Sequence, residues 1–155
     1  IRNMRADARP VQRVAMLSHS THGSMPTKSS QCVAAATALA KDIAKREFLD
    51  LEIDGEIQAD VALDMIAAEQ KFTDKKALQP ADVLVFPNLD SANISYKILM
   101  HTAHVNCYGQ LIIGLSRHAA QLPVTASVDS IIGTAALVGT ETIKFRELYP
   151  DGDIL

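Results

Sequence analysis

The stretch ADVLVFP, residues 81–87, decides the fold. Its apolar residues follow one another without a break from Val83 to Phe86, and Pro87 then halts the run. An uninterrupted apolar, β-branched run of this length is typical of a strand that is buried on both faces of a parallel sheet. The stretch therefore predicts such a strand over 81–87, with helices packed on the sheet's faces.

Segments on either side of this stretch alternate between two kinds of pattern. Three more predict strands: RVAMLS (13–18), LDLEIDG (49–55) and GQLIIGL (109–115). Four others have helical patterns: SSQCVAAATALAKDIAKREF (29–48), ADVALDMIAAEQKF (59–72), NISYKILMHTAH (93–104) and VDSIIGTAALVGTETIKFREL (128–148). Strict alternation of strands and helices predicts an α/β fold, a three-layer α/β/α domain with a mostly parallel sheet over residues 1–155.

The composition is that of a globular protein, with 48% hydrophobic and 21% charged residues. A net charge of −3 argues against nucleic acid or an anionic membrane as the main partner. No apolar run reaches the roughly 18 residues of a membrane span. Cys32 and Cys107 lie far apart, so we expect two reduced, buried thiols in a cytoplasmic protein. The chain begins without Met, which suggests a domain cut from a longer protein.

The loop after the first predicted strand, SHSTHGS (18–24), carries the first candidate ligand-binding residues. Open parallel sheets bind ligands beyond the carboxyl ends of their strands. Five residues here could hold an anion through hydroxyl and backbone N–H groups: Ser18, Ser20, Thr21, Gly23 and Ser24. The alternative is a capped turn that binds no ligand.

Two further loops follow predicted strands. PNLDSANISYK (87–97) offers four candidate binding residues: Asp90, Asn93, Tyr96 and Lys97. Asp90 and Asn93 are equally suited to a turn and a helix cap. The third loop, GLSRHAAQLPVTASVDSI (114–131), begins with Ser116, Arg117 and His118 and is then largely apolar. It has few groups that could do chemistry.

The five histidines form no set of metal ligands. His19 and His22 lie three residues apart, as do His101 and His104, but no carboxylate or cysteine stands near either pair at ligand spacing. We therefore expect no metal site.

Four stretches together resemble the phosphotransacetylase (phosphate acetyl- and butyryltransferase) family. VAMLSHSTHGS (14–24) is similar to the family's VALLSYSTxGS, and IDGEIQADVAL (53–63) to its IDGELQxDAAL. ADVLVFPNLDSANISYK (81–97) is similar to ANVLIFPDLDAGNIGYK, and GQLIIGL (109–115) to GPILQGL. The resemblance covers nearly the whole chain and corresponds to about the C-terminal half of a phosphotransacetylase. It implies the matching half of the isocitrate/isopropylmalate dehydrogenase-like fold.

The family's next segment, GLxKPVNDLSRGxSVEDI, supplies its catalytic Ser, Arg and Asp, which stabilise the transition state, hold phosphate and deprotonate the CoA thiol. Aligned without gaps on residues 114–131, these three fall on Pro123, Val124 and Ser130. Both flanks of the segment match in this alignment. Placing Ser116 and Arg117 on the catalytic pair instead would require an insertion and a deletion. The resemblance therefore implies that the family's catalytic residues are replaced here.

A scaffold that is intact around a replaced catalytic loop resembles the C-terminal domain of large bacterial NADP-dependent malic enzymes. That resemblance implies a non-catalytic regulatory and oligomerisation domain that senses acetyl-CoA. No cofactor is then expected in this domain; NADP and a divalent metal belong to the missing malic-enzyme part, and the chain forms a homo-oligomer. Two alternatives stay open: an active phosphate acetyltransferase that moves an acyl group between acyl phosphate and CoA, and a purely structural oligomerisation module. The sequence does not decide which acyl-CoA binds.

Overall fold

The computed structural model describes residues 12–71, 79–103, 105, 107–115 and 117–148. Two compact units divide the chain, one reaching to Ser95 and the other beginning at Tyr96. The predicted single domain over residues 1–155 stays a prediction. In the described part of the chain, no helix is long and apolar enough to cross a membrane.

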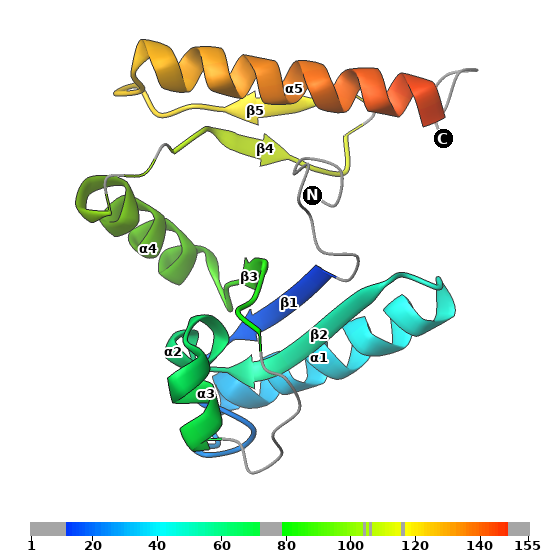
Figure 1. Ribbon diagram of the computed structural model, residues 1–155, viewed down its shortest axis with the longest axis vertical. Helices are drawn as coiled ribbons and strands as arrows, with labels where there is room; N and C mark the ends of the chain where they lie inside the picture. The colour runs from blue at the N-terminus through cyan, green and yellow to red at the C-terminus, as the bar shows by residue number, and fades with distance from the viewer. Residues whose placement is uncertain (1–11, 72–78, 104, 106, 116, 149–155) are drawn as a thin grey trace. The chain divides into compact units, whose positions relative to one another are not determined.

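A parallel sheet forms the centre of the first unit (Figure 1). Strand β1 (Gln12–Leu17) pairs on one side with β2 (Leu51–Ile57) and on the other with β3 (Val83–Val85). This confirms the predicted α/β class and the parallel sheet. One expectation is wrong: β3 has one described neighbour and only partial burial, because β1, not the 81–87 run, is the central strand.

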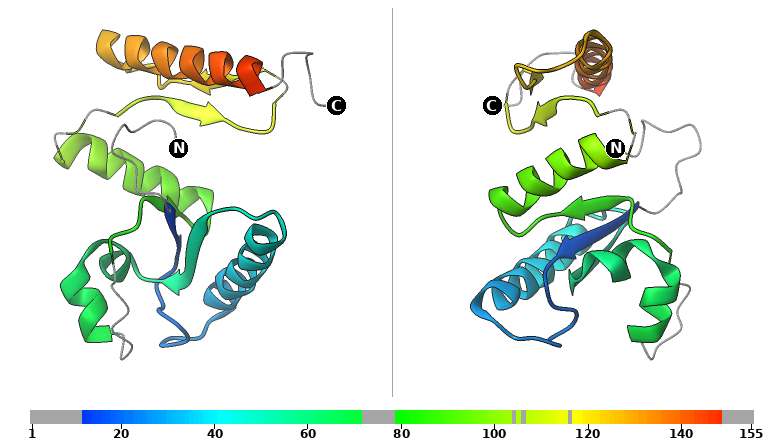
Figure 2. Two further views of the ribbon diagram at one scale, coloured as in Figure 1. Left: turned by 45° about the vertical axis from the view of Figure 1, so that its right-hand side comes forward. Right: turned by 90° about the vertical axis from the view of Figure 1, so that its left-hand side faces the viewer.

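Helices cover both faces of this sheet (Figure 2). Helix α1 (Lys28–Arg46) begins at a capping box formed by Thr27 and Ser30, and it packs on the face that carries Gly55. The opposite face packs against α2 (Ala59–Leu63) and α3 (Met65–Lys71). A core cluster joins them: Ala15, Leu17, Ile57, Val61, Ala62 and Ala68. The first unit is thus layered α/β/α.

The predicted helix over 59–72 is two helices. Asp64 between them has extended backbone angles, φ −115° and ψ 118°. Its carboxylate accepts a hydrogen bond from the N–H of Ile66 at 2.8 Å and so caps the start of α3. An aspartate that caps a new helix competes with continuation of the old one, which the apolar spacing alone does not reveal.

The second unit contains an antiparallel pair of strands that the sequence did not predict. Strand β4 (Gln110–Ile112) pairs with β5 (Ala119–Gln121), and α5 (Val128–Leu148) packs on β5. The predicted strand over 109–115 is therefore shortened, and it belongs to this separate sheet. Helix α4 (Leu89–Thr102) begins four residues before the predicted start at Asn93. Of the two predicted buried thiols, Cys32 is exposed and Cys107 half-buried.

Candidate functional site

The first two candidate loops lie at the same edge of the parallel sheet. Loop 18–24 follows the last residue of β1, and Asn88 and Asp90 follow β3 after a short turn. Because β1, β2 and β3 run parallel, their carboxyl ends meet at one edge. The structure therefore places loop 18–24 and the start of α4 at one edge of the sheet, and hydrogen bonds join the loop to Glu56, near the end of β2.

Glu56 is the residue on which loop 18–24 is built. Its side chain is 5% exposed, and its Oε1 accepts a hydrogen bond from the Ser20 hydroxyl at 2.9 Å and from the Gly23 N–H at 2.8 Å. Its backbone oxygen accepts a third from the His22 N–H at 3.0 Å. Gly23 has φ +79°, a conformation that glycine adopts without strain.

The loop's remaining polar groups are also used inside the protein. Thr21 donates its hydroxyl proton to Gln58 at 3.2 Å and accepts from the Gln58 N–H at 3.0 Å. The backbone N–H groups of Ser18 and of every residue from Ser20 to Met25 donate to groups of the protein. The alternative interpretation of a capped turn thus describes the loop's backbone. These N–H groups are not directed at an external anion.

Burial by itself raises the pKa of the Glu56 carboxyl. The hydrogen bonds from the Gly23 N–H and the Ser20 hydroxyl, with the nearby His22, outweigh that effect and hold the pKa below its ordinary range. Glu56 is therefore a charged group at neutral pH beneath the loop.

We predict that acid destabilises the protein partly through Glu56. A lowered pKa in the folded state contributes stability above the pKa of the unfolded chain, about 4.3 for glutamate, and this stability is lost as the pH falls through the folded-state pKa. Urea unfolding between neutral pH and about pH 3 measures the loss. As the pH falls, the free energy of unfolding should decrease more steeply in the wild type than in Glu56→Gln. Equal pH dependence in the two proteins would contradict the prediction.

The predicted residues of the second loop divide between two settings. Asn88 caps α4, because its side chain accepts a hydrogen bond from the Ser91 N–H at 2.9 Å. Asp90 and Asn93 lie exposed in the first half of α4. Tyr96 and Lys97 belong to the second unit, where the Lys97 ammonium lies 5.6 Å from the centroid of the Tyr96 ring.

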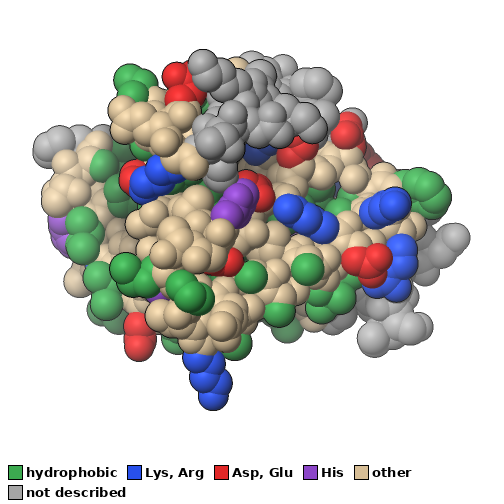
Figure 3. All heavy atoms as spheres, turned by 90° about the horizontal axis from the view of Figure 1, so that it is seen from below, with side chains coloured by type: hydrophobic (Ala, Val, Ile, Leu, Met, Phe, Trp, Pro, Cys, Tyr) green, Lys and Arg blue, Asp and Glu red, His purple; other side chains and the backbone are tan. Residues whose placement is uncertain are grey.

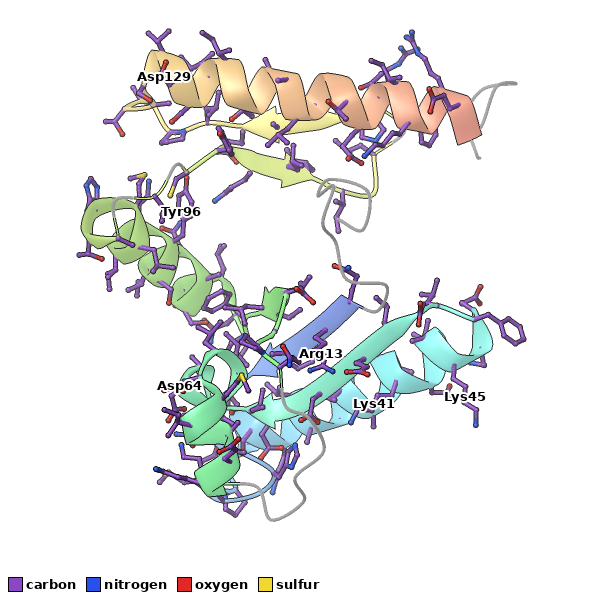
Figure 4. The ribbon with its side chains drawn as sticks, viewed as in Figure 1. Arg13, Lys41, Lys45, Asp64, Tyr96 and Asp129 are labelled. Atoms are coloured by element: carbon purple, nitrogen blue, oxygen red, sulfur yellow. The ribbon has the colours of Figure 1, made fainter. Side chains whose placement is uncertain are left out.

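The second unit has a cavity of about 510 Å³ at the start of α5. Its polar lining includes Tyr96, His101 and Asp129, the first and last of which are labelled in Figure 4. The Tyr96 hydroxyl donates to the Tyr108 carbonyl at 3.2 Å. Burial, and then the neighbouring Cys107, raises the pKa of Tyr96, so the phenol keeps its proton at neutral pH.

The three positions aligned with the family's catalytic residues lie at or near this cavity. Pro123 and Ser130 line it, whereas Val124 points fully into solvent. The Ser130 hydroxyl is engaged with the Cys107 carbonyl at 3.1 Å. Asp129, the preceding residue, also lines the cavity.

The hairpin of β4 and β5 separates Arg117 from this cavity. Arg117 lies in the turn before β5, and Pro123 follows the other end of the strand. The six residue steps between them span up to about 20 Å in extended chain. Arg117 is not among the described residues that line this cavity. Ser116 lies outside the described residues, so the choice between the two alignments stays a prediction.

The first unit has its own cavity, of about 680 Å³, between the sheet and α2–α3. Charged side chains line it, including the labelled Arg13, Lys41 and Asp64 (Figure 4), and they pair among themselves. Arg13 contacts Glu52 at 2.8 Å, and Lys41 contacts Asp54 at 3.4 Å. Lys and Arg side chains also lie beside Asp and Glu on the face shown in Figure 3. Because positive and negative side chains alternate and pair here, they do not indicate a particular class of ligand.

Two residues at these sites, Glu56 and Asp129, were missed as candidates. Glu56 stands in the matched stretch IDGEIQADVAL, and Asp129 stands in the first turn of α5, where an acidic residue is common in any helix. The signal for Glu56 was a charged residue directly before an apolar strand end. Among the described residues, no three His, Cys, Asp or Glu side chains gather to hold a metal ion.

Comparison with known proteins gives a consistent result. The phosphate acetyl/butaryl transferase family model matches residues 4–139. The phosphate acetyltransferase of Acetivibrio thermocellus is 37% identical over 129 residues, which are 83% of this chain and 38% of that protein. That of Borreliella burgdorferi is 38% identical over 126 residues, 81% of this chain and 35% of that protein. The chain thus spans less than half the length of these relatives.

Solved structures agree. EutD phosphotransacetylase from Staphylococcus aureus superposes with a TM-score of 0.76 at 33% identity, over 84% of this chain and 40% of that one. A phosphotransacetylase from Streptococcus pyogenes superposes with a TM-score of 0.67 at 30% identity, over 84% of this chain and 39% of that one.

The predicted identity as a regulatory and oligomerisation domain of a malic enzyme is therefore wrong. The matched relatives are phosphate acetyltransferases, which favours the transferase alternative. The prediction gave three aligned positions of one loop more importance than the rest of the chain, and it overlooked Asp129 beside them. By sequence over most of its length and by fold, this chain belongs to the phosphate acetyl/butaryl transferase family.

Proposed function

We propose that this chain is part of a phosphate acyltransferase that moves an acyl group between phosphate and the thiol of CoA. The names of its relatives support this reaction class. Within the chain, the observation that carries the proposal is the cavity at the start of α5, where Asp129 and His101 supply groups that accept protons.

The reaction requires the removal of one proton. The CoA sulfur forms a bond to the acyl carbon, the bond from that carbon to the phosphate oxygen breaks, and the thiol proton must leave. We assign Asp129 to accept this proton and to return it to the departing phosphate or to water. No metal or redox group is needed to balance this step.

Asp129 suits this role by its place in the fold. It lies in the first turn of α5, and it lines the cavity. The Tyr96 hydroxyl donates to a backbone carbonyl and keeps its proton, so it does not compete as a base.

The ligand residues named from the sequence are part of this proposal. Loop 18–24, Asp90 and Asn93 lie at the carboxyl edge of the sheet in the first unit, where open parallel sheets bind ligands. Tyr96 lines the cavity of the second unit, and Lys97 lies beside it on α4. An acyl-CoA is the proposed partner. Assembly into a homo-oligomer and the absence of a cofactor stay predictions.

The test is direct. Purified protein of full natural length is supplied with acetyl phosphate and CoA, and acetyl-CoA formation is followed by absorbance of the thioester. We expect turnover that saturates in both substrates, and parallel assays with butyryl phosphate determine the acyl preference. Acetyl-CoA formation no faster than without protein would overturn the proposal.

A further inference from the structure

The proposed chemistry in the second unit does not use the buried carboxylate of the first. Glu56 is 5% exposed, yet among the described residues it makes no ion pair that would explain a buried charge by itself; its closest partners are Ser20 and Gly23. Burying a carboxylate costs free energy unless hydrogen bonds compensate. The hydrogen bonds that compensate for the burial of Glu56 come from loop 18–24, so the carboxylate fixes this loop.

Glu56 holds loop 18–24 at three points. One carboxylate oxygen accepts from the Ser20 hydroxyl and from the Gly23 N–H, and the Glu56 backbone oxygen accepts from the His22 N–H. The Ser20 oxygen in turn accepts from the Met25 N–H at 3.0 Å, so the hold reaches the loop's far end. Hydrogen bonds to a charged acceptor are about twice as strong as neutral ones.

This hold determines which groups the loop presents outward. Ser20 and Thr21 are buried, while Ser24 is exposed and Ser18 half-buried. The His22 side chain is 45% exposed and contacts Asp54 at 3.2 Å. His22 and Gly23 both have positive φ, of 44° and 79°, which is a conformation that the Glu56 bonds help to fix.

The chemistry of the outward face favours an uncharged polar ligand group. The N–H groups of Ser18 and of residues 20–25 donate within the protein, and a negative charge lies beneath the loop. Hydroxyl groups remain as the donors, and these suit the amide and hydroxyl groups of the CoA arm better than a phosphate dianion.

We infer that Glu56 is a positioning residue that sets the conformation in which loop 18–24 receives the uncharged arm of acyl-CoA. This rests on the proposed function, because an acyl-CoA ligand is part of it. Glu56 acts through Ser20 and Gly23 and does not touch the ligand.

The test combines two measurements on protein of full natural length, in the wild type, Glu56→Ala, Glu56→Gln and Glu52→Ala. Calorimetric titration gives the Kd for acetyl-CoA, and hydrogen exchange reports on the amides of His22 and Gly23. Glu52 is a matched control, because it is an exposed glutamate on the same strand, paired only with Arg13 in the described contacts. Thermal melts verify that each variant is folded.

For Glu56→Ala we expect at least about a tenfold weaker Kd, together with faster exchange of the Gly23 amide, because its hydrogen bond to the charged carboxylate is lost. The His22 amide should respond less, because it donates to the Glu56 backbone oxygen, which alanine keeps. Glu56→Gln keeps an oxygen acceptor and should recover part of both effects. Glu52→Ala should match the wild type in both. If Glu56→Gln restores part of the affinity and of the exchange protection, Glu56 acts by positioning the loop. A loss of folding would instead speed exchange at amides throughout the protein.

Two results would overturn the inference: unchanged acetyl-CoA affinity in folded Glu56→Ala, or exchange of the Gly23 amide that does not respond to the substitution. An equal loss of affinity for inorganic phosphate would overturn the assignment of the loop to the uncharged arm. A wild type that binds acetyl-CoA but forms none from acetyl phosphate would refute the proposed function alone, and the binding and exchange results would still decide the role of Glu56.

Discussion

Replacing Asp129 with asparagine should lower kcat for acetyl transfer by about 10²- to 10⁴-fold, the usual contribution of a positioned general base. The asparagine side chain keeps the size and the polarity of the aspartate but cannot accept the thiol proton. Because binding groups elsewhere are unchanged, KM for acetyl phosphate should change far less than kcat. Initial rates over a range of both substrates separate the two constants.

Glu141→Gln is the matched control for Asp129→Asn. Glu141 lies on the same helix, beside Lys144, and lines a different small cavity. The substitution removes one negative charge from α5, as Asp129→Asn does, and should leave kcat unchanged. Thermal melts control for the loss of a favourable charge at the helix N-terminus, worth about 0.3–1 kcal/mol. If Asp129→Asn retains most of its activity, the proton goes elsewhere, and His101 is the other acceptor that lines the cavity.

The sequence predicts the parallel sheet and the helices around it because apolar periodicity is a local signal. The long helix at 128–148 and the strand at 13–18 are found with nearly the predicted bounds. Strand β5, and with it the antiparallel pairing of β4, is missed because a three-residue strand carries almost no periodicity, and β5 is Ala-Ala-Gln. The break at Asp64 is missed because a cap, not an apolar position, ends the helix.

The candidate site is less accessible to sequence reasoning, because its contacts join distant segments. Glu56 reaches Ser20 across 36 residues and Gly23 across 33. The pattern of β2 marks Glu56 only as a polar residue in a strand. Asp129 satisfies the rule for the first turn of a helix. Its position at a cavity depends on distant residues that line the same cavity, such as His101, Tyr108 and Leu122.

Gly55→Ala should destabilise the first unit by at least about 2 kcal/mol, at the upper part of the usual range for overpacking. A Cβ at this position would lie 2.6 Å from Met16 Cβ, 2.7 Å from the Met16 carbonyl oxygen and 2.8 Å from Thr37 Oγ1. The carbonyl belongs to the central strand, and Thr37 is buried and donates to the Val33 carbonyl at 2.8 Å. Neither can move without breaking pairing between β1 and β2 or shifting α1.

Gly55 combines a φ of +152° with close contacts, and two other glycines distinguish these two causes of the loss. Gly114 has φ +81° and nothing within 4 Å of an added Cβ, so Gly114→Ala measures the cost of a positive φ without a clash. Gly139 lies inside α5 with equally open space, so Gly139→Ala should instead stabilise the protein by about 0.5–1 kcal/mol. Urea unfolding of the three variants gives the order. If Gly55→Ala lowers the free energy of unfolding no more than Gly114→Ala does, α1 and β2 tolerate a wider separation. The close approach at Gly55 would then not determine how tightly the helix packs on the sheet.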